Sequence, residues 1–129
     1  MDTSKEYIKM CEKAVEIQEK WKVEEGDFCT ERDFQCRTPV GCIDDGQAVW
    51  SNNQDELADW HRDCIWLPRQ DQLQEMWKPE GIFMQKCGTL IFWLEQQDLL
   101  MHKWSGEQLW LAFVMKELYS KQWNGEDWT

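Results

Sequence analysis

Long apolar runs are missing from this sequence. The longest, LWLAFVM at 109–115, has seven residues, whereas a membrane-spanning helix needs roughly 18. The N-terminal MDTSKEYIKMCEK also lacks the apolar core and the small-residue cleavage site of a signal peptide. We therefore expect no contact with membranes and a cytoplasmic location.

Motifs for nucleotides and metals are missing as well. The chain has no G-x-x-x-x-G-K-[ST] and no G-x-G-x-x-G, and Asp44-Asp45-Gly46 lacks the ligand ladder of an EF-hand. No two of the six cysteines have C-x-x-C spacing. Without an export signal, we expect these cysteines to be reduced and mostly buried as small apolar groups. The sequence predicts no cofactor and no metal.

Histidine is scarce, which limits acid–base chemistry. His102 is expected near a helix C-terminus, where it favours the helix dipole. On a strand, Asp59, His61 and Asp63 would share one face, a geometry that a metal or an acid–base site uses. An exposed polar edge would show the same pattern. We expect no enzyme, and a weak enzyme centred on His61 is kept as an alternative.

Negative charge is abundant and unevenly distributed. The formal net charge is -11, and residues 23–63 alone hold eleven acids against three arginines, a net charge of -8. Residues 1–22 are neutral, and residues 64–129 have a net charge of -3. An acidic surface repels phosphate backbones and attracts basic protein surfaces. We expect no direct binding of nucleic acid, although a solubilising face is the simpler interpretation.

The first part of the chain predicts a helix. Thr3 and Glu6 have the spacing of a capping box, and apolar residues then recur every three or four positions. A helix over 4–21 follows. Glu16 and Lys20 would form an ion pair on its outer face.

The middle of the chain predicts a small antiparallel sheet. Between 23 and 67, β-rich runs such as DFCTER, FQCRTPVGCI, QAVW and DCIWLP alternate with turn signals. Asp45-Gly46 favours a hairpin because both residues tolerate a positive φ. Residues 51–63 are polar and turn-like.

The C-terminal half predicts two or three helices. Pro68 suits the first position of one helix, and residues 88–104 form another. Ser105 with Gln108 is a second capping box and begins a buried helix. That helix is expected to end near Gly125.

Together these patterns predict one α+β domain over residues 1–129. It comprises the helix 4–21, an acidic β and loop region 23–67, and a helical region 68–123 packed on the sheet. The sequence leaves the oligomeric state open, a homodimer included.

Tryptophan is abundant, with ten residues, and it is enriched at interaction hot spots. Two tryptophans lie within the acidic middle. We therefore predict a contact surface for a partner protein. Its residues are Asp44, Asp45, Trp50, Asp55, Glu56, Asp59 and Trp60.

Three segments resemble a family of small proteins that phages and prophages of gut Firmicutes encode. They are YIKMCEKAVEIQEKW at 7–21, WLPRQDQLQEM at 66–76 and EQLWLAFVMKELYSKQWNGEDW at 107–128. The resemblance covers both ends of the chain and agrees least over 23–63. It implies a phage-type protein in the host cytoplasm, and it carries no activity or catalytic residue over to this chain.

The hypothesis that joins these observations is a non-enzymatic inhibitor that binds a host protein. The partner would be an antiviral nuclease or effector with a basic nucleic-acid-binding surface, so the protein would be anti-CRISPR-like or otherwise anti-defence. Its acidic surface would imitate the charge of nucleic acid. The alternative from another class is a binder that sequesters a signalling nucleotide in an aromatic pocket.

Overall fold

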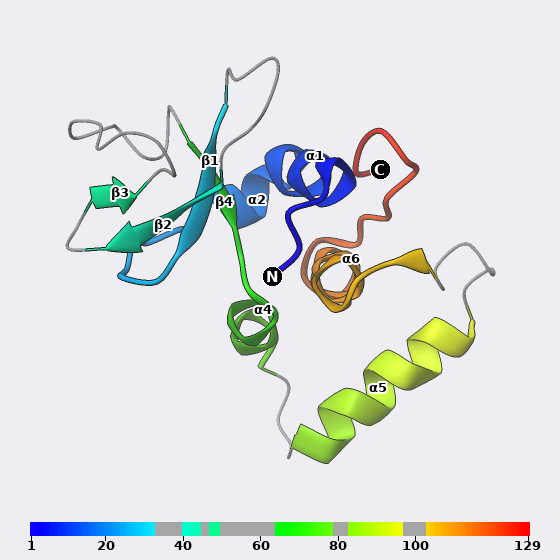
Figure 1. Cartoon of the computed structure of the whole chain (residues 1–129). Helices are drawn as coiled ribbons and strands as arrows, with labels where there is room; N and C mark the ends of the chain where they lie inside the picture. Colours follow the sequence, from blue (N-terminus) through cyan, green and yellow to red (C-terminus); the bar gives the residue numbers. More distant parts are fainter. Residues whose placement is uncertain (33–39, 45–46, 50–63, 79–82, 97–102) are drawn as a thin grey trace.

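The computed structural model describes residues 1–32, 40–44, 47–49, 64–78, 83–96 and 103–129 (Figure 1). It has the expected α+β architecture. An N-terminal helix is followed by an antiparallel sheet and then by further helices. The elements are α1 (Lys5–Lys13), α2 (Val15–Gln18), β1 (Phe28–Glu31), β2 (Val40–Asp44), β3 (Gln47–Val49), β4 (Cys64–Leu67), α4 (Gln70–Met76), α5 (Phe83–Glu95) and α6 (Gly106–Tyr119).

The N-terminal helix differs from the prediction in its cap and in its continuity. Ser4, not Thr3, is the N-cap, and its hydroxyl accepts a hydrogen bond from the Tyr7 N–H at 3.2 Å. The single helix predicted over 4–21 is divided, because Ala14 has φ -83 and ψ 66. This residue is fully buried. The backbone therefore changes direction at a core position.

The sheet has four strands in the order β3-β2-β1-β4, and every neighbouring pair is antiparallel. The predicted hairpin is confirmed in its pairing, because Asp44 of β2 lies opposite Gln47 of β3. The turn residues 45–46 lie outside the described part of the chain. The predicted strands around DFCTER and DCIWLP are β1 and β4, which pair with each other from Phe28↔Leu67 to Glu31↔Cys64.

β4 lies at one edge of the sheet, and a side chain of α2 pairs with it. Gln18 Nε2 donates to the Trp66 carbonyl at 3.0 Å, and the Trp66 N–H donates to Gln18 Oε1 at 2.8 Å. The indole rings of Trp21 and Trp66 are parallel within 2°, with centroids 6.1 Å apart. These contacts bring α2 and the residues after it against the sheet.

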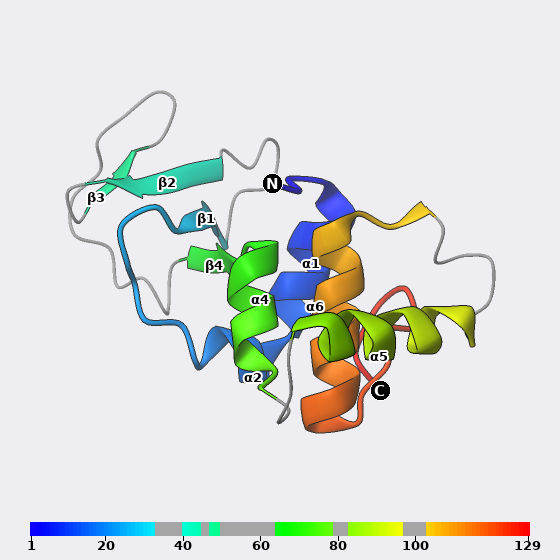
Figure 2. The same ribbon diagram turned by 90° about the horizontal axis from the view of Figure 1, so that it is seen from below.

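The C-terminal helices form most of the core. α6 packs against α1 and α4, and α1 packs against β4. Residues Trp110 to Met115 of α6 are all buried, as their apolar run predicted. Phe113 contacts three tryptophan rings, at centroid distances of 4.8, 5.5 and 5.8 Å. The core therefore lies between the N-terminal helix, β4 and α6, while α5 runs across α6 on the side away from the sheet (Figures 1 and 2).

The predicted helix boundaries need three corrections. Pro68 lies before α4 rather than at its first position, and Arg69 is the N-cap. α5 spans Phe83–Glu95 instead of 88–104. α6 ends at Tyr119, because Ser120 adopts a left-handed conformation with φ 55. Gly125, the predicted cap, instead has φ 99 in the chain between Trp123 and Trp128, which form an isolated antiparallel bridge.

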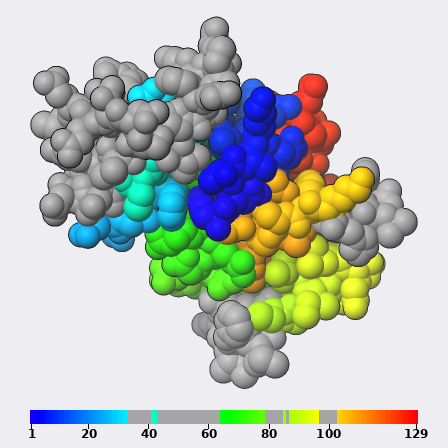
Figure 3. Space-filling view, in the orientation of Figure 1, coloured from blue at the N-terminus to red at the C-terminus, as the bar shows by residue number. Residues whose placement is uncertain are grey.

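The start of α6 is joined to the N-terminal segment. The Ser105–Gln108 capping box is confirmed, with the Gln108 N–H donating to Ser105 Oγ at 3.1 Å. Ser105 Oγ donates to Asp2 Oδ2 at 2.5 Å, and Gln108 Nε2 donates to Ser4 Oγ at 3.2 Å. The N-caps of α1 and α6 therefore share one hydrogen-bond network, and the two segments adjoin on the face shown in Figure 3. Within the described residues, no helix is both long and apolar enough to span a bilayer.

Candidate functional site

The two ends of the sheet have different surroundings. At one end β1 finishes at Glu31, β2 begins at Val40 and β4 begins at Cys64. The antiparallel pairing places Glu31, Val40 and Cys64 at the same end, whereas Val49, the last residue of β3, lies opposite Cys42 and so level with Phe28, with β3 running toward that end. We call it the acidic end, because residues 50–63, which join β3 to β4, contain four acids and one arginine.

The structure places one of the predicted contact residues. Asp44 ends β2, at the end of the sheet opposite the acidic end. The chain that carries the remaining candidates leaves β3 at Val49 and enters β4 at Cys64. Asp45, Trp50, Asp55, Glu56, Asp59 and Trp60 lie outside the described residues, as do His61 and His102.

Arg32 ties the end of β1 to the start of β4. Its Nη2 donates to the Cys64 carbonyl at 3.3 Å. The backbones of Glu31 and Cys64 lie opposite each other in the sheet register. Residues 50–63 therefore enter β4 next to a hydrogen bond that joins β1 to β4.

Beside this contact lies a cleft that the sequence did not predict. Its volume is about 470 Å³, and α1, α2 and the residues after them line it together with Arg32. The lining residues are Glu12, Val15, Gln18, Glu19, Trp21 and Arg32. Helical spacing could have placed the two glutamates on one side of the predicted helix. The cleft itself also needs Arg32, which comes from the chain after β1.

The chemistry of the cleft suits a basic side chain with an aliphatic stem. Glu12 and Glu19 supply carboxylates, whereas Val15 is 55% exposed and supplies apolar surface. Lysine and arginine pack their methylene stems on apolar surface while their charged heads contact carboxylates. Arg32 also lines the cleft, so its lining holds two carboxylates and one guanidinium, a formal net charge of -1.

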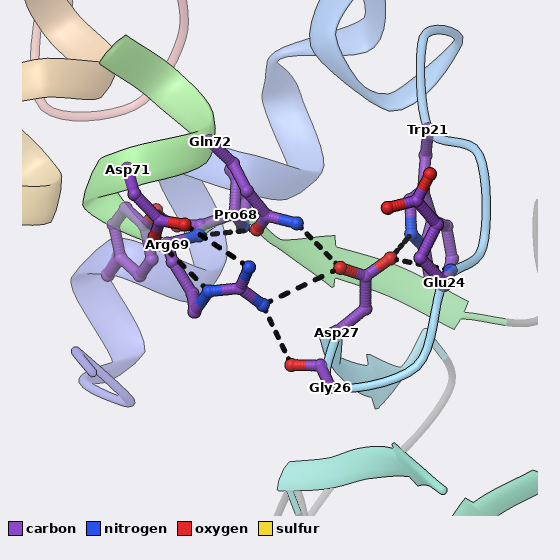
Figure 4. A network of polar contacts seen from close by, with 9 residues as sticks. Trp21, Glu24, Gly26, Asp27, Pro68, Arg69, Asp71 and Gln72 are labelled. Carbon is purple, nitrogen blue, oxygen red and sulfur yellow. Dashed lines mark hydrogen bonds and ion pairs between the residues drawn. The ribbon is translucent and has the colours of Figure 1, made fainter. Parts of the chain in front are cut away.

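The opposite end of the sheet holds a buried carboxylate, Asp27, which is 1% exposed (Figure 4). Asp27 Oδ2 accepts hydrogen bonds from Trp21 Nε1 at 2.8 Å and from the Glu24 N–H at 3.0 Å. Asp27 Oδ1 accepts one from Gln72 Nε2 at 2.6 Å. This carboxylate therefore joins the chain before β1 to α4.

Arg69 completes the Asp27 network. Its Nη1 lies 3.7 Å from Asp27 Oδ1 and donates to the Gly26 carbonyl at 2.8 Å. On its solvent side, its Nε lies 3.1 Å from Asp71 Oδ1, and this guanidinium holds the pKa of Asp71 below its usual value. Asp27 is thus paired with Arg69 inside the protein, and it does not form part of the acidic surface. Its hydrogen bonds indicate a structural role.

The buried thiols are chemically quiet. Cys29 and Cys64, on neighbouring strands, form a side-chain hydrogen bond, and this contact with burial raises the pKa of Cys29 far above its usual value. Burial raises the pKa of Cys11 in the same way. A thiol that stays protonated is a poor nucleophile and a poor metal ligand. Across the described ranges, no group of three or more His, Cys, Asp or Glu side chains could hold a metal ion.

The tryptophans of the described ranges are mainly core residues. Six of them are at most 8% exposed, namely Trp21, Trp66, Trp77, Trp93, Trp110 and Trp128. Each packs on another tryptophan ring or on Phe113. Only Trp21 contributes to the cleft beside Arg32. These side chains therefore offer little support for an aromatic nucleotide pocket.

Comparison of the chain with protein-family models, curated proteins and solved structures finds no match.

Proposed function

We propose that the protein is a non-enzymatic, phage-type inhibitor that binds a host protein. The partner is an antiviral nuclease or effector, and the acidic residues occupy its basic surface in place of nucleic-acid phosphates. The observation that carries the proposal is the net charge of -8 over residues 23–63. The four-stranded sheet, which this region supplies with three strands and most of its connections, supports it.

The sheet topology favours charge imitation because the acidic connection, residues 50–63 with four acids and one arginine, returns to one end of the sheet. The chain 50–63 leaves β3 after Val49, where β3 runs toward the acidic end, and it enters β4 at that end at Cys64. Carboxylates joined to one end of a sheet act together on an approaching basic surface, and their attraction raises the rate of encounter. Ionic strength of about 0.15 M screens this attraction beyond roughly 8 Å. Binding should therefore weaken as salt is added.

The cleft beside Arg32 supports a protein partner over free nucleic acid. Glu12 and Glu19 repel phosphate and attract lysine or arginine, and the exposed Val15 offers contact to an aliphatic stem. We propose that this cleft forms one border of the interface and takes a basic side chain of the partner.

The decisive experiment captures the partner from a bacterial host lysate at low salt and then measures affinity with purified proteins. The test variant combines Asp55→Asn, Glu56→Gln and Asp59→Asn. The matched control combines Glu75→Gln, Glu117→Gln and Glu126→Gln, three exposed acids in the C-terminal half. Both variants lose three negative charges, so net charge alone does not distinguish them.

We expect the test variant to bind at least about tenfold more weakly, a difference of roughly 1.4 kcal/mol, and to show a flatter dependence on salt. The control should bind within about threefold of wild type, since exposed charges away from an interface contribute little. Equal losses in both variants would contradict a specific acidic interface. Failure to capture any partner at low salt would remove the proposal altogether.

A further inference from the structure

We draw no further inference here: the strongest candidate, the apolar outer face of α5 where Ile91 and Phe92 are exposed, carries no proposal because nothing in the described part of the chain shows what covers it.

Discussion

One end of the sheet buries a carboxylate, whereas under our proposal carboxylates joined to the other end bind a partner. At one end, Asp27 is buried and accepts three hydrogen bonds, so its charge holds β1 to α4. Residues 50–63, which enter β4 at the acidic end, contain four acids and one arginine. A carboxylate stabilises a fold where N–H groups surround it, and it remains able to attract a partner where they do not. Substitution of Asp27 should therefore change the stability of the fold, whereas substitution of the acidic residues 55, 56 and 59 should change the affinity for a partner.

The largest expected effect on stability is at Asp27. Asp27→Asn keeps the size of the side chain but replaces one acceptor oxygen by an NH₂ group, which must then face Gln72 Nε2 or the donors of Trp21 and Glu24. We expect a loss of about 3 kcal/mol in the free energy of unfolding, because a buried network loses its charge and one acceptor. Urea denaturation followed by tryptophan fluorescence measures this loss.

Asp71→Asn is the matched control, since Asp71 also contacts Arg69 but its side chain is 65% exposed. Its cost should stay below about 1 kcal/mol. Equal costs for the two variants would mean that burial does not distinguish these carboxylates. A loss of partner binding in folded Asp27→Asn would contradict the separation of stability from binding.

A smaller effect is expected at Ser105, which caps α6 and joins it to the N-terminal segment. Ser105→Ala removes the acceptor of the Gln108 N–H and the donor to Asp2. The free energy of unfolding should fall by about 1 kcal/mol, with partner affinity unchanged. Thr3→Ala, at the cap position that the sequence predicted wrongly, should cost less than about 0.5 kcal/mol. A larger cost at Thr3 than at Ser105 would contradict the observed caps.

The smallest effect concerns the part-buried ion pair of Glu16 with Lys121. A hydrogen bond from Lys121 is the main cause that lowers the pKa of Glu16, with partial burial acting against it. A pKa lowered by folding gives stability that is present above the unfolded value of about 4.3 and is lost as pH falls through the folded value. Lys121→Met should therefore cost a few tenths of a kcal/mol at neutral pH.

This difference between wild type and Lys121→Met should disappear at pH values below the folded pKa of Glu16. Thermal melting at several pH values between about 3 and 7 measures it. A difference that stays constant, or that grows on acidification, would assign the effect of Lys121 to packing rather than to charge.

Features governed by neighbouring residues could be predicted from the sequence. The Ser105–Gln108 capping box, the hairpin pairing of Asp44 with Gln47, and the burial of the run around Phe113 each depend on a few adjacent side chains. These features were sufficient to predict the α+β class. They also located the sheet and the central helix.

Features that depend on distant contacts could not be predicted. The sequence pattern predicted an ion pair of Glu16 with Lys20, one helical turn away. In the structure Glu16 contacts Lys121 instead, and the Lys20 ammonium lies 5.3 Å from the ring centroid of Tyr119. Nothing local marks Ala14 as a break, because alanine is a strong helix former. Its conformation accompanies the docking of Gln18 on β4, a contact across 48 residues.

The candidate site likewise has one property that the sequence predicts, its charge, and one that the sequence does not predict, its cleft. Its charge could be read from composition, since net charge needs no fold. The cleft lined by Glu12, Glu19 and Arg32 could not, because its lining combines residues of α1 and α2 with a residue that follows β1. Asp27 counted as part of the acidic middle in the sequence, and only its buried position shows that it belongs to the interior.

The pairing of Gln18 with Trp66 also bears on how the chain avoids self-association through its sheet. An edge strand with free N–H and carbonyl groups is a template for strands of other molecules, and through them for aggregation. On β4, the amide of Gln18 occupies both backbone groups of Trp66, and Arg32 occupies the carbonyl of Cys64. Two side chains thus take the place that an incoming strand would need, which closes this edge to fibril-like growth.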